Sequence, residues 1–459
     1  MISKFVDRED ELKALEDQWN STPSLVIIYG RRRTGKTRLL VEFSQGKPTF
    51  FYTFMEDTRE RQIRRLREEL AEHFNDELFL SFNDWYPLFK YLASKVTEKT
   101  LIILDEFSYA IKSDRTIVSA LQRAWDHDFS KKPVMLVLSG SLIGMMIDEV
   151  LSYSSPLYGR RTMSFHLKPL TLFNSLKFFD SFEVGLEMYM LVGGIPAYLI
   201  IASRYEDTRR FIEETFLRTE GFFYDEPYIL LSGELRELKT YFSILSATAS
   251  GKTRASEIAS YAGLEGRKIY PYLDTLVRLG FIEREIPIAR NDKRGIYKLK
   301  DPMLLTWFSI VPKNRTGIEL GIISYDDVKE DIQRIYGIRF EDVAREFLVE
   351  LNRRGRLPFR FTRIGRWWYK GEEIDIVAVN ERLKRILLAE VKWKELSKRE
   401  AKGILKDLKR KFKLMNLEGW DASFALVAKN VHGKSKLREY GFNVWDLEDL
   451  KLHFEKKFR

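Results

Sequence analysis

The 459-residue chain is too long for one ordinary hydrophobic core, and at about 150 residues per domain it predicts roughly three domains. With 44% hydrophobic and 31% charged residues it has the balance of a globular protein, which excludes an intrinsically disordered one. The net charge is +10, and the absence of cysteine excludes disulfide frameworks, thiolate zinc sites and cysteine nucleophiles.

The excess positive charge is confined to the last third of the chain. Residues 331–459 hold 31 Lys+Arg against 20 Asp+Glu, whereas residues 1–330 are close to neutral. A basic domain usually binds a polyanion, so the sequence predicts nucleic acid, most often DNA, as the partner. A solvated, lysine-rich surface is the alternative interpretation.

Neither a signal peptide nor a membrane span is expected. The N-terminus, "MISKFVDRED", carries acidic residues within its first ten positions and has no apolar h-region. The longest apolar stretches fall short of the roughly 18 continuous residues that a span requires. Together with the lack of cysteine, these features predict a cytoplasmic protein without a membrane partner.

The strongest motif is a phosphate-binding loop. In "SLVIIYGRRRTGKTRLL" an apolar run, Leu25–Tyr29, leads into G-x-x-x-x-G-K-T, and the pattern of an amphipathic helix follows. Such a loop turns its backbone N–H groups toward a β-phosphate, while Lys36 reaches the β- and γ-phosphates and the Thr37 hydroxyl binds Mg²⁺. The predicted nucleotide-binding residues of the loop are Gly30, Arg31, Arg32, Arg33, Thr34, Gly35, Lys36 and Thr37.

Two further apolar runs supply the rest of the predicted nucleotide site. "TLIILDEF" (100–107) has the Walker B pattern, in which Asp105 holds the Mg²⁺ and Glu106 polarises the attacking water. "VMLVLSGS" (134–141) ends in Ser139 and Ser141, so Ser139 is predicted to lie beside the γ-phosphate. The alternative is that Ser-Gly-Ser forms an ordinary turn.

The order of strand and helix patterns predicts a parallel, doubly wound α/β sheet with its site at the carboxyl ends of the strands. "YGRRT" (158–162) offers Arg160 and Arg161 as candidate arginine fingers, and Arg160 is predicted to contact the nucleotide. Solvated arginines are the alternative. A finger supplied by a neighbouring copy would imply a homo-oligomer.

Five motifs in a fixed order carry a family resemblance. "FVDREDEL", "GRRRTGKT", "LDEF", "SGS" and "VGGIPAY" resemble the archaeal ATPase family, which is close to the STAND and AAA+ ATPases. The resemblance covers residues 1–210 and implies an ATPase domain there that uses ATP and Mg²⁺. The positions that it assigns to the surroundings of the adenine are Asp7, Arg8 and Glu9, and those that it assigns to a helical lid are Gly194 and Pro196.

Residues 211–320 are predicted to form a helical connector and a winged helix. "RASEIASYAG" and "EGRKIYPYLDTLVRLGFI" have the pattern of a helix-turn-helix with its turn at Gly263. "FIEREIPIARNDKRGIYKLKDP" alternates and turns at Asn291–Gly295, which predicts a β-hairpin wing. Contact with DNA and packing against protein remain alternatives for this domain. The side chains expected to face DNA are Arg267, Lys268 and Tyr272 on the recognition helix and Arg290, Lys293 and Arg294 on the wing.

The C-terminal part, 331–459, places charged residues where buried strands favour Val or Ile. An amphipathic helix, 340–351, is followed by three strand patterns, a lysine-rich helix at 398–413 and a further strand. Asp375 lies in the second strand, and "AEVKW" in the third strand carries Glu390 and Lys392. Burying such charges is costly unless they are paired or hold a metal ion.

This αβββαβ order with Asp375 and a Glu-x-Lys motif resembles the PD-(D/E)XK nuclease superfamily, in the form fused to archaeal ATPases, and implies a restriction-endonuclease-like α/β domain. Strand alternation puts Glu390 and Lys392 on one face, where a neighbouring strand can bring Asp375. The two carboxylates and the Val391 carbonyl suit Mg²⁺, and Lys392 would position or deprotonate the attacking water. Glu341 is predicted as a further metal ligand. The alternatives are a structural charge cluster and a nuclease fold that has lost its activity.

Two functions therefore follow from the sequence. The first is an ATPase that couples ATP hydrolysis to work on nucleic acid, most often DNA, with a Mg²⁺-dependent nuclease or a DNA clamp at its C-terminus. The second is a STAND-like switch, in which ATP drives a change of assembly and the C-terminal domain is an inactive scaffold.

Overall fold

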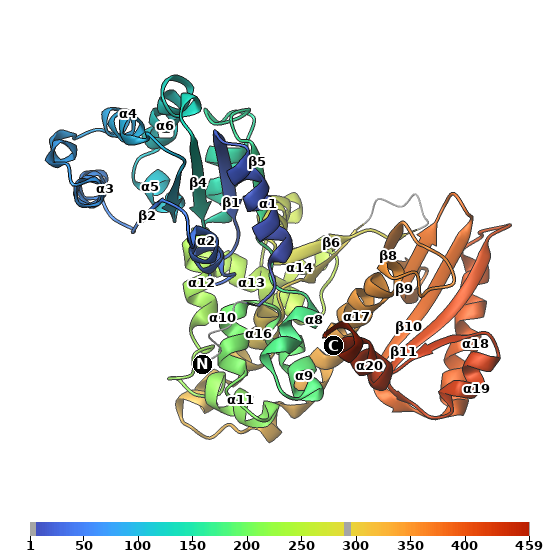
Figure 1. Ribbon diagram of the computed structural model, residues 1–459. Coiled ribbons are helices and arrows are strands. Elements are labelled where there is room, and N and C mark those ends of the chain that lie inside the picture. The colour runs from blue at the N-terminus through green and yellow to red at the C-terminus, as the bar shows by residue number, and fades with distance from the viewer. Residues whose placement is uncertain (1–5, 289–294, 459) are drawn as a thin grey trace. The chain divides into compact units, whose positions relative to one another are not determined.

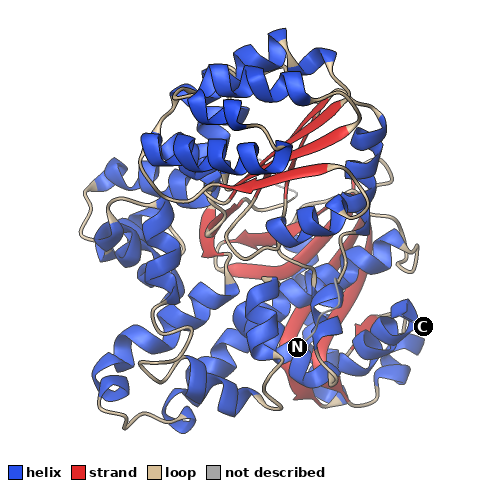
Figure 2. Ribbon diagram, turned by 60° about the vertical axis from the view of Figure 1, so that its left-hand side comes forward, coloured by secondary structure: helices blue, strands red, loops and turns tan. Residues whose placement is uncertain are grey.

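A computed structural model describes residues 6–288 and 295–458. The chain is of mixed α/β class, with a parallel ATPase-type sheet and a second, C-terminal sheet, which confirms the predicted fold class (Figure 2). The division into domains at 1–210, 211–320 and 331–459 stays a prediction. The residues separate into two compact units, of which the first comprises Met1–Leu170, Ile195–Ala197 and Leu230–Glu234, and the second Thr171–Gly194, Tyr198–Ile229 and Leu235–Arg459.

The sheet of the first unit is parallel throughout, in the order β2-β3-β4-β1-β5 (Figure 1). Its central strands read as nearly unbroken apolar runs because helices cover both faces. Leu25 and Ile27 of β1 pack into one core, and Val26 and Ile28 pack into the other. The strands are β1 Ser24–Tyr29, β2 Thr49–Thr53, β3 Thr100–Asp105, β4 Val134–Gly140 and β5 Met163–His166.

Helices on the two faces of this sheet come from different parts of the chain. The core that contains Val26 also takes side chains from α1 and α2, and the core that contains Leu25 takes them from α3 to α6. The helices of this unit are α1 Glu9–Asn20, α2 Lys36–Ser44, α3 Arg59–Phe74, η1 Glu77–Ser81, α4 Trp85–Lys95, α5 Phe107–Ser113, α6 Thr116–His127, η2 Phe129–Lys131, α7 Ile143–Met145 and η3 Met146–Leu151.

The second unit begins with helices and a two-stranded hairpin. The predicted recognition segment starts as a 3₁₀ turn, which holds Arg267 and Lys268, and becomes α-helical only at Tyr270, because Pro271 favours the first helical turn. The predicted wing residues Arg290, Lys293 and Arg294 lie outside the described residues. The elements are α8 Leu172–Ser175, η4 Leu176–Phe178, α9 Phe182–Val192, α10 Pro196–Ala202, α11 Thr208–Thr215, α12 Glu226–Glu234, α13 Leu238–Ala249, α14 Ala255–Tyr261, η5 Gly266–Ile269, α15 Tyr270–Arg278, β6 Ile282–Glu285, β7 Ile296–Leu299, α16 Pro302–Glu319 and α17 Tyr325–Arg353.

The C-terminal sheet has the order β12-β11-β10-β9-β8 (Figure 1). β8, β9 and β10 are antiparallel neighbours, whereas β10, β11 and β12 run parallel. The predicted order of one helix, three strands, one helix and one strand is present from α17 to β11. The elements are β8 Arg363–Tyr369, β9 Glu372–Asn380, β10 Arg385–Leu396, α18 Lys398–Leu414, β11 Asp421–Val431, α19 Lys434–Glu439, β12 Asn443–Trp445 and α20 Leu447–Phe458.

Helices α17 and α18 cover opposite faces of this sheet. Trp393 of β10 packs edge-on against Phe340 of α17, at 5.0 Å between ring centroids. Alternate residues of the same strand, such as Leu388, pack instead with Leu405 and Leu408 of α18. The face on which a β10 side chain lies therefore decides which helix it meets.

Within the described ranges, no helix is both long and apolar enough to cross a membrane.

Candidate functional site

The phosphate-binding loop joins β1 to α2 in the predicted way. A Cβ on Gly30 would lie 2.5 Å from the backbone oxygen of Leu167, so only glycine fits there. Gly35 has φ +91° and precedes α2. Lys36 Nζ donates to the carbonyl oxygens of Gly30, at 2.9 Å, and Arg31, at 3.1 Å. Burial lowers the pKa of Lys36, although Glu106 and Asp105 favour its charged form.

Hydrogen bonds hold the side chains of Thr34 and Arg32 in the loop. Thr34 Oγ1 donates to the Arg31 carbonyl at 2.8 Å, and the Arg32 guanidinium binds the hydroxyl of Tyr109. Arg8, one of the residues assigned by resemblance to the adenine surroundings, donates to the backbone of Lys168 at 2.7 Å. Together with the hydrogen bonds from Lys36, these contacts fix the conformation of the loop.

Asp105, at the end of β3, lies next to the loop. Its Oδ2 accepts a 2.6 Å hydrogen bond from Thr37 Oγ1, and its side chain is fully buried. A hydroxyl and a carboxylate brought together in this way are oxygen ligands of the kind that Mg²⁺ prefers. The sequence prediction that these two residues share a site therefore agrees with their geometry.

Glu106 is held by Ser141, the last residue of "VMLVLSGS". Its backbone has φ +52°, a conformation that is uncommon outside glycine. Glu106 Oε2 accepts hydrogen bonds from Ser141 Oγ at 2.6 Å and from the Ser141 amide at 3.1 Å. The contact forms because β4 lies between β1 and β3. Ser139, the predicted nucleotide contact, has a buried hydroxyl without a hydrogen-bond partner among the described residues.

Arg160, the predicted finger, is engaged elsewhere. Its Nε lies 2.8 Å from Asp126 Oδ1 and 3.0 Å from Oδ2, at the end of α6, and this hydrogen bonding lowers the pKa of Asp126. Arg161 Nη1 donates to the Leu151 carbonyl at 3.2 Å. For Arg160 to act on a nucleotide, its ion pair with Asp126 would first have to break.

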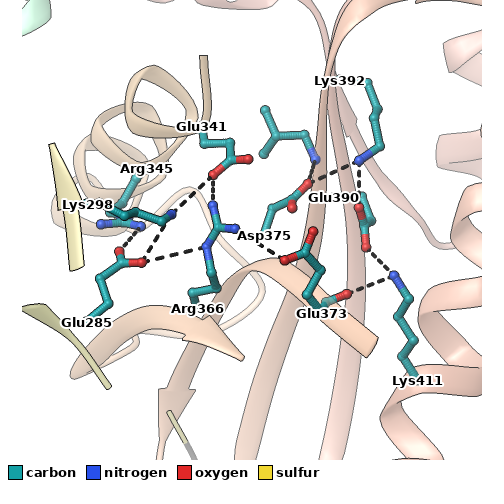
Figure 3. Close-up of polar contacts among 11 residues, drawn as sticks. Glu285, Lys298, Glu341, Arg345, Arg366, Glu373, Asp375, Glu390, Lys392 and Lys411 are labelled. Atoms are coloured by element: carbon teal, nitrogen blue, oxygen red, sulfur yellow. Dashed lines mark hydrogen bonds and ion pairs between the residues drawn. The ribbon is translucent and has the colours of Figure 1, made fainter. Parts of the chain in front are cut away.

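Asp375, Glu390 and Lys392 meet on one face of the C-terminal sheet (Figure 3). Lys392 Nζ lies 3.3 Å from Asp375 Oδ2 and 2.9 Å from Glu390 Oε2. Asp375 also accepts from the Val391 amide at 2.8 Å, and Glu390 accepts from Lys411 of α18 at 2.8 Å. Both carboxylates are buried, at 4% and 6% exposure. The charges are tolerated because each is paired.

The same contacts set the protonation of this cluster. Burial favours the neutral form of Asp375, but Lys392 and the Val391 amide outweigh it, so the pKa of Asp375 is lowered. Burial and the neighbouring Asp375 carboxylate raise the pKa of Glu390. Burial opposes the charge on Lys392, yet the two carboxylates raise its pKa. The cluster thus favours an ionised Asp375 beside a protonated Lys392.

Glu341, the further predicted metal ligand, belongs to a second cluster. It comes from α17, on the face opposite α18, and it pairs with Arg366 and, at 3.9 Å, with Lys298 (Figure 3). Arg366 also reaches Glu285 at 3.7 Å and Glu373 at 3.6 Å. In the described parts of the chain, no group of three His, Cys, Asp or Glu side chains could hold a metal ion.

The comparisons with known proteins point to one family. Residues 5–201 match the model of an "ATPase domain predominantly from Archaea", and residues 307–404 match "Archaea bacterial proteins of unknown function". An uncharacterized protein of Methanocaldococcus jannaschii is 37% identical over 452 residues, which span 97% of this chain and 99% of that protein. The chain belongs to the archaeal ATPase family.

Two further proteins to which this archaeal ATPase is similar come from Pyrococcus abyssi. An uncharacterized ATP-binding protein is 29% identical over 170 residues, covering 36% of this chain and 48% of that protein. A Walker-type ATPase of known structure is 23% identical with a TM-score of 0.48, covering 67% of this chain and 96% of that one. With the loop geometry above, family membership makes the chain a P-loop ATPase that binds and hydrolyses a nucleoside triphosphate.

The archaeal ATPase also carries a basic stripe on α18. Lys402, Lys406, Lys409 and Lys413 recur at helical spacing, and all four side chains are exposed. An adjacent face of the helix, about 100° away around its axis, is apolar and buries Ala401, Leu405 and Leu408. The amphipathic pattern thus turns a row of cations to solvent.

Proposed function

We propose that this ATPase uses ATP binding and hydrolysis to act on nucleic acid, with DNA as the favoured substrate. We further propose that its C-terminal domain is a Mg²⁺-dependent nuclease or a DNA clamp. The observation that carries the proposal is the meeting of Asp375, Glu390 and Lys392 on one sheet face. Two carboxylates and a lysine in this arrangement are the parts that metal-assisted phosphodiester hydrolysis requires.

At the first site, Mg²⁺ would be held by Thr37 and Asp105 next to the nucleotide phosphates. Glu106 would orient the attacking water, with Ser141 fixing its carboxylate. Thr37 and Asp105 would thereby place a positive charge beside the phosphates, where negative charge develops during hydrolysis.

At the second site, Asp375, Glu390 and the Val391 carbonyl are the oxygen ligands that would hold Mg²⁺. The ammonium group of Lys392 already bridges the two carboxylates, which supports the view that the pair attracts a cation. Lys392 would position or deprotonate the attacking water, the role that the sequence assigns to it. Glu341 would act from outside the metal's immediate surroundings, because Arg366 and Lys298 hold it.

Contact with nucleic acid is proposed for two regions. The exposed lysines of α18 would follow a phosphate backbone. Helices α14 and α15 with the β6–β7 hairpin have the order of a winged helix, which we propose as the second contact. Tyr272, on α15, donates a 2.6 Å hydrogen bond to Glu237. Its hydroxyl could therefore contact nucleic acid only after this hydrogen bond is broken.

One observation favours the second candidate, a STAND-like switch with an inactive C-terminal scaffold. Lys392 pairs with both carboxylates of the second site, and Lys411 pairs with Glu390 as well. A cluster balanced in this way can serve as structure alone. In that case ATP would drive a change of assembly, and DNA would not be a substrate.

Cleavage of linear, branched and single-stranded DNA with and without ATP and Mg²⁺ separates the two functions. We expect Mg²⁺-dependent cleavage that falls by about 10²-fold or more in Asp375→Ala and Lys392→Ala, since both residues act on the reacting groups. Lys394→Ala, an exposed lysine two residues further along β10, is the matched control and should retain activity. Absence of cleavage on every substrate, together with ATP turnover that DNA does not alter, would favour the switch.

A further inference from the structure

A short segment far from the phosphate-binding loop in sequence belongs to the ATPase unit. Residues Leu230–Glu234, the last part of α12, group with the first unit, whereas the residues before and after them belong to the second. Glu234 Oε1 accepts a 2.8 Å hydrogen bond from the Ile143 amide. A Cβ on Gly233 would lie 3.8 Å from the Leu142 side chain. The segment is therefore fitted against the chain that follows β4.

This position is next to the nucleotide site. Leu142 and Ile143 directly follow Ser141, which holds Glu106 through its hydroxyl and amide. The end of β4 lies between the strands that carry the phosphate-binding loop and the Walker B carboxylates. The Glu234 carboxylate thus reaches the edge of the sheet at which a triphosphate binds.

The charge on Glu234 interacts with the cations of the loop. Burial raises the pKa of Glu234, against the amides of Ile143 and Gly144 and the nearby guanidinium groups of Arg31 and Arg32. Glu234 in turn favours the charged form of Lys36. A carboxylate in this position competes with phosphate oxygens for the same positive groups.

We propose that Glu234 is a positioning residue that lets this ATPase distinguish ATP from ADP and relays the difference to the second unit. A γ-phosphate adds negative charge where the Glu234 carboxylate is held, so it repels Glu234 from the loop while ADP does not. The carboxylate then leaves the Ile143 amide, and the displacement reaches Leu235, the first residue of the next stretch of the second unit. The inference needs only the ATPase activity and does not depend on the nucleic-acid or nuclease assignments.

The test compares the affinities of a non-hydrolysable ATP analogue and of ADP, each with Mg²⁺, in the full chain. Glu234→Gln keeps an oxygen that can accept from Ile143 but removes the charge. We expect the ratio of analogue to ADP affinity to rise about fivefold or more, because only the triphosphate is relieved of repulsion. Glu234→Ala should shift the ratio in the same direction even if it lowers stability, since a ratio is independent of the folded fraction.

Glu226→Gln is the matched control. Glu226 is a buried carboxylate at the other end of α12 and accepts a 2.6 Å hydrogen bond from Tyr198, so its removal reports general damage to the helix. The ratio of ATP-analogue to ADP affinity in Glu226→Gln should equal that of the wild type. A Glu234→Gln ratio within twofold of wild type, or an equal shift in Glu226→Gln, would overturn the proposal.

Amide hydrogen exchange tests the relay separately. In the wild type, peptides covering residues 230–238 should exchange faster with the ATP analogue than with ADP, and Glu234→Gln should abolish that difference. If the affinity ratio shifts but these peptides exchange equally with both nucleotides in the wild type, Glu234 senses the γ-phosphate without relaying it, and the second half of the proposal is wrong.

Discussion

Ser141 shows how a single hydroxyl can fix the orientation of a carboxylate. Glu106 occupies a left-handed backbone conformation, and a carboxylate in such a turn has several staggered orientations open to it. The 2.6 Å hydrogen bond from Ser141 Oγ selects one of them. The residue that would polarise the attacking water is thus positioned by the next strand of the sheet.

Ser141→Ala should slow ATP hydrolysis about tenfold while leaving the affinity for ATP within about threefold of wild type. The hydroxyl is lost but the backbone amide of residue 141 still reaches Glu106, so positioning is weakened rather than abolished. Steady-state turnover and equilibrium nucleotide binding, measured on the same preparation, separate the two quantities.

Ser139→Ala distinguishes the two serines of "SGS". Since the Ser139 hydroxyl has no hydrogen-bond partner within the described structure, we expect turnover within about twofold of wild type. A loss as large as that of Ser141→Ala would instead support the sequence prediction that Ser139 contacts the nucleotide.

At the scale of elements, the β6–β7 hairpin and the C-terminal sheet are joined in two ways. The Ile288 amide donates to the Arg366 carbonyl of the edge strand β8 at 2.9 Å, and the Ile288 side chain enters the sheet's core. Glu285 of the hairpin binds Arg345 of α17 at 2.9 Å. An exposed strand edge is a liability, and here a neighbouring element covers part of it.

Ile288→Ala should lower the free energy of unfolding of the second unit by about 2–4 kcal/mol, because the side chain is only 5% exposed and its loss leaves a cavity. Ile286→Ala is the control: Ile286 lies two residues away but is 49% exposed, and its removal should cost about 0.5 kcal/mol or less. Chemical denaturation of both variants gives the comparison. Equal losses would show that Ile288 does not anchor the hairpin.

At the scale of the whole molecule, charge is distributed unevenly along the chain. The basic excess lies in residues 331–459, and the cations and carboxylates of the two buried clusters of this part pair with one another. The unpaired excess therefore appears at the surface, most regularly along α18. A polyanion would be attracted to this surface first.

Replacing Lys406 and Lys413 together by alanine should weaken DNA binding and reduce the slope of log K against log salt concentration by about 1–2, since each phosphate contact contributes about 0.9. Lys90→Ala with Lys131→Ala removes two exposed lysines of the first unit and should leave the slope unchanged. Binding titrations at several salt concentrations provide the slopes. If the slope falls equally in both double variants, DNA binding depends on the overall charge of the protein and not on the lysines of α18.

Prediction from sequence was most direct for residues that are contiguous in the chain or related by strand alternation. The loop at 30–37 could be identified because its glycines, lysine and threonine must be contiguous to wrap a phosphate. Asp375 and Glu390 were expected to share a face because strand period and antiparallel pairing bring them there. Glu341 was grouped with them because helix α17 precedes the strands, but which face that helix covers depends on packing.

The sequence by itself determined the nucleotide loop, the alternation of strands and helices and the placement of positive charge, because each follows from local spacing and composition. Only the tertiary structure decided that Ser141 holds Glu106, that Asp126 holds Arg160, that Arg366 takes Glu341 and that Glu234 reaches the chain after β4. These contacts join residues from 25 to 91 positions apart in the chain. Their partners are chosen by strand order and helix packing, which no short stretch of sequence encodes.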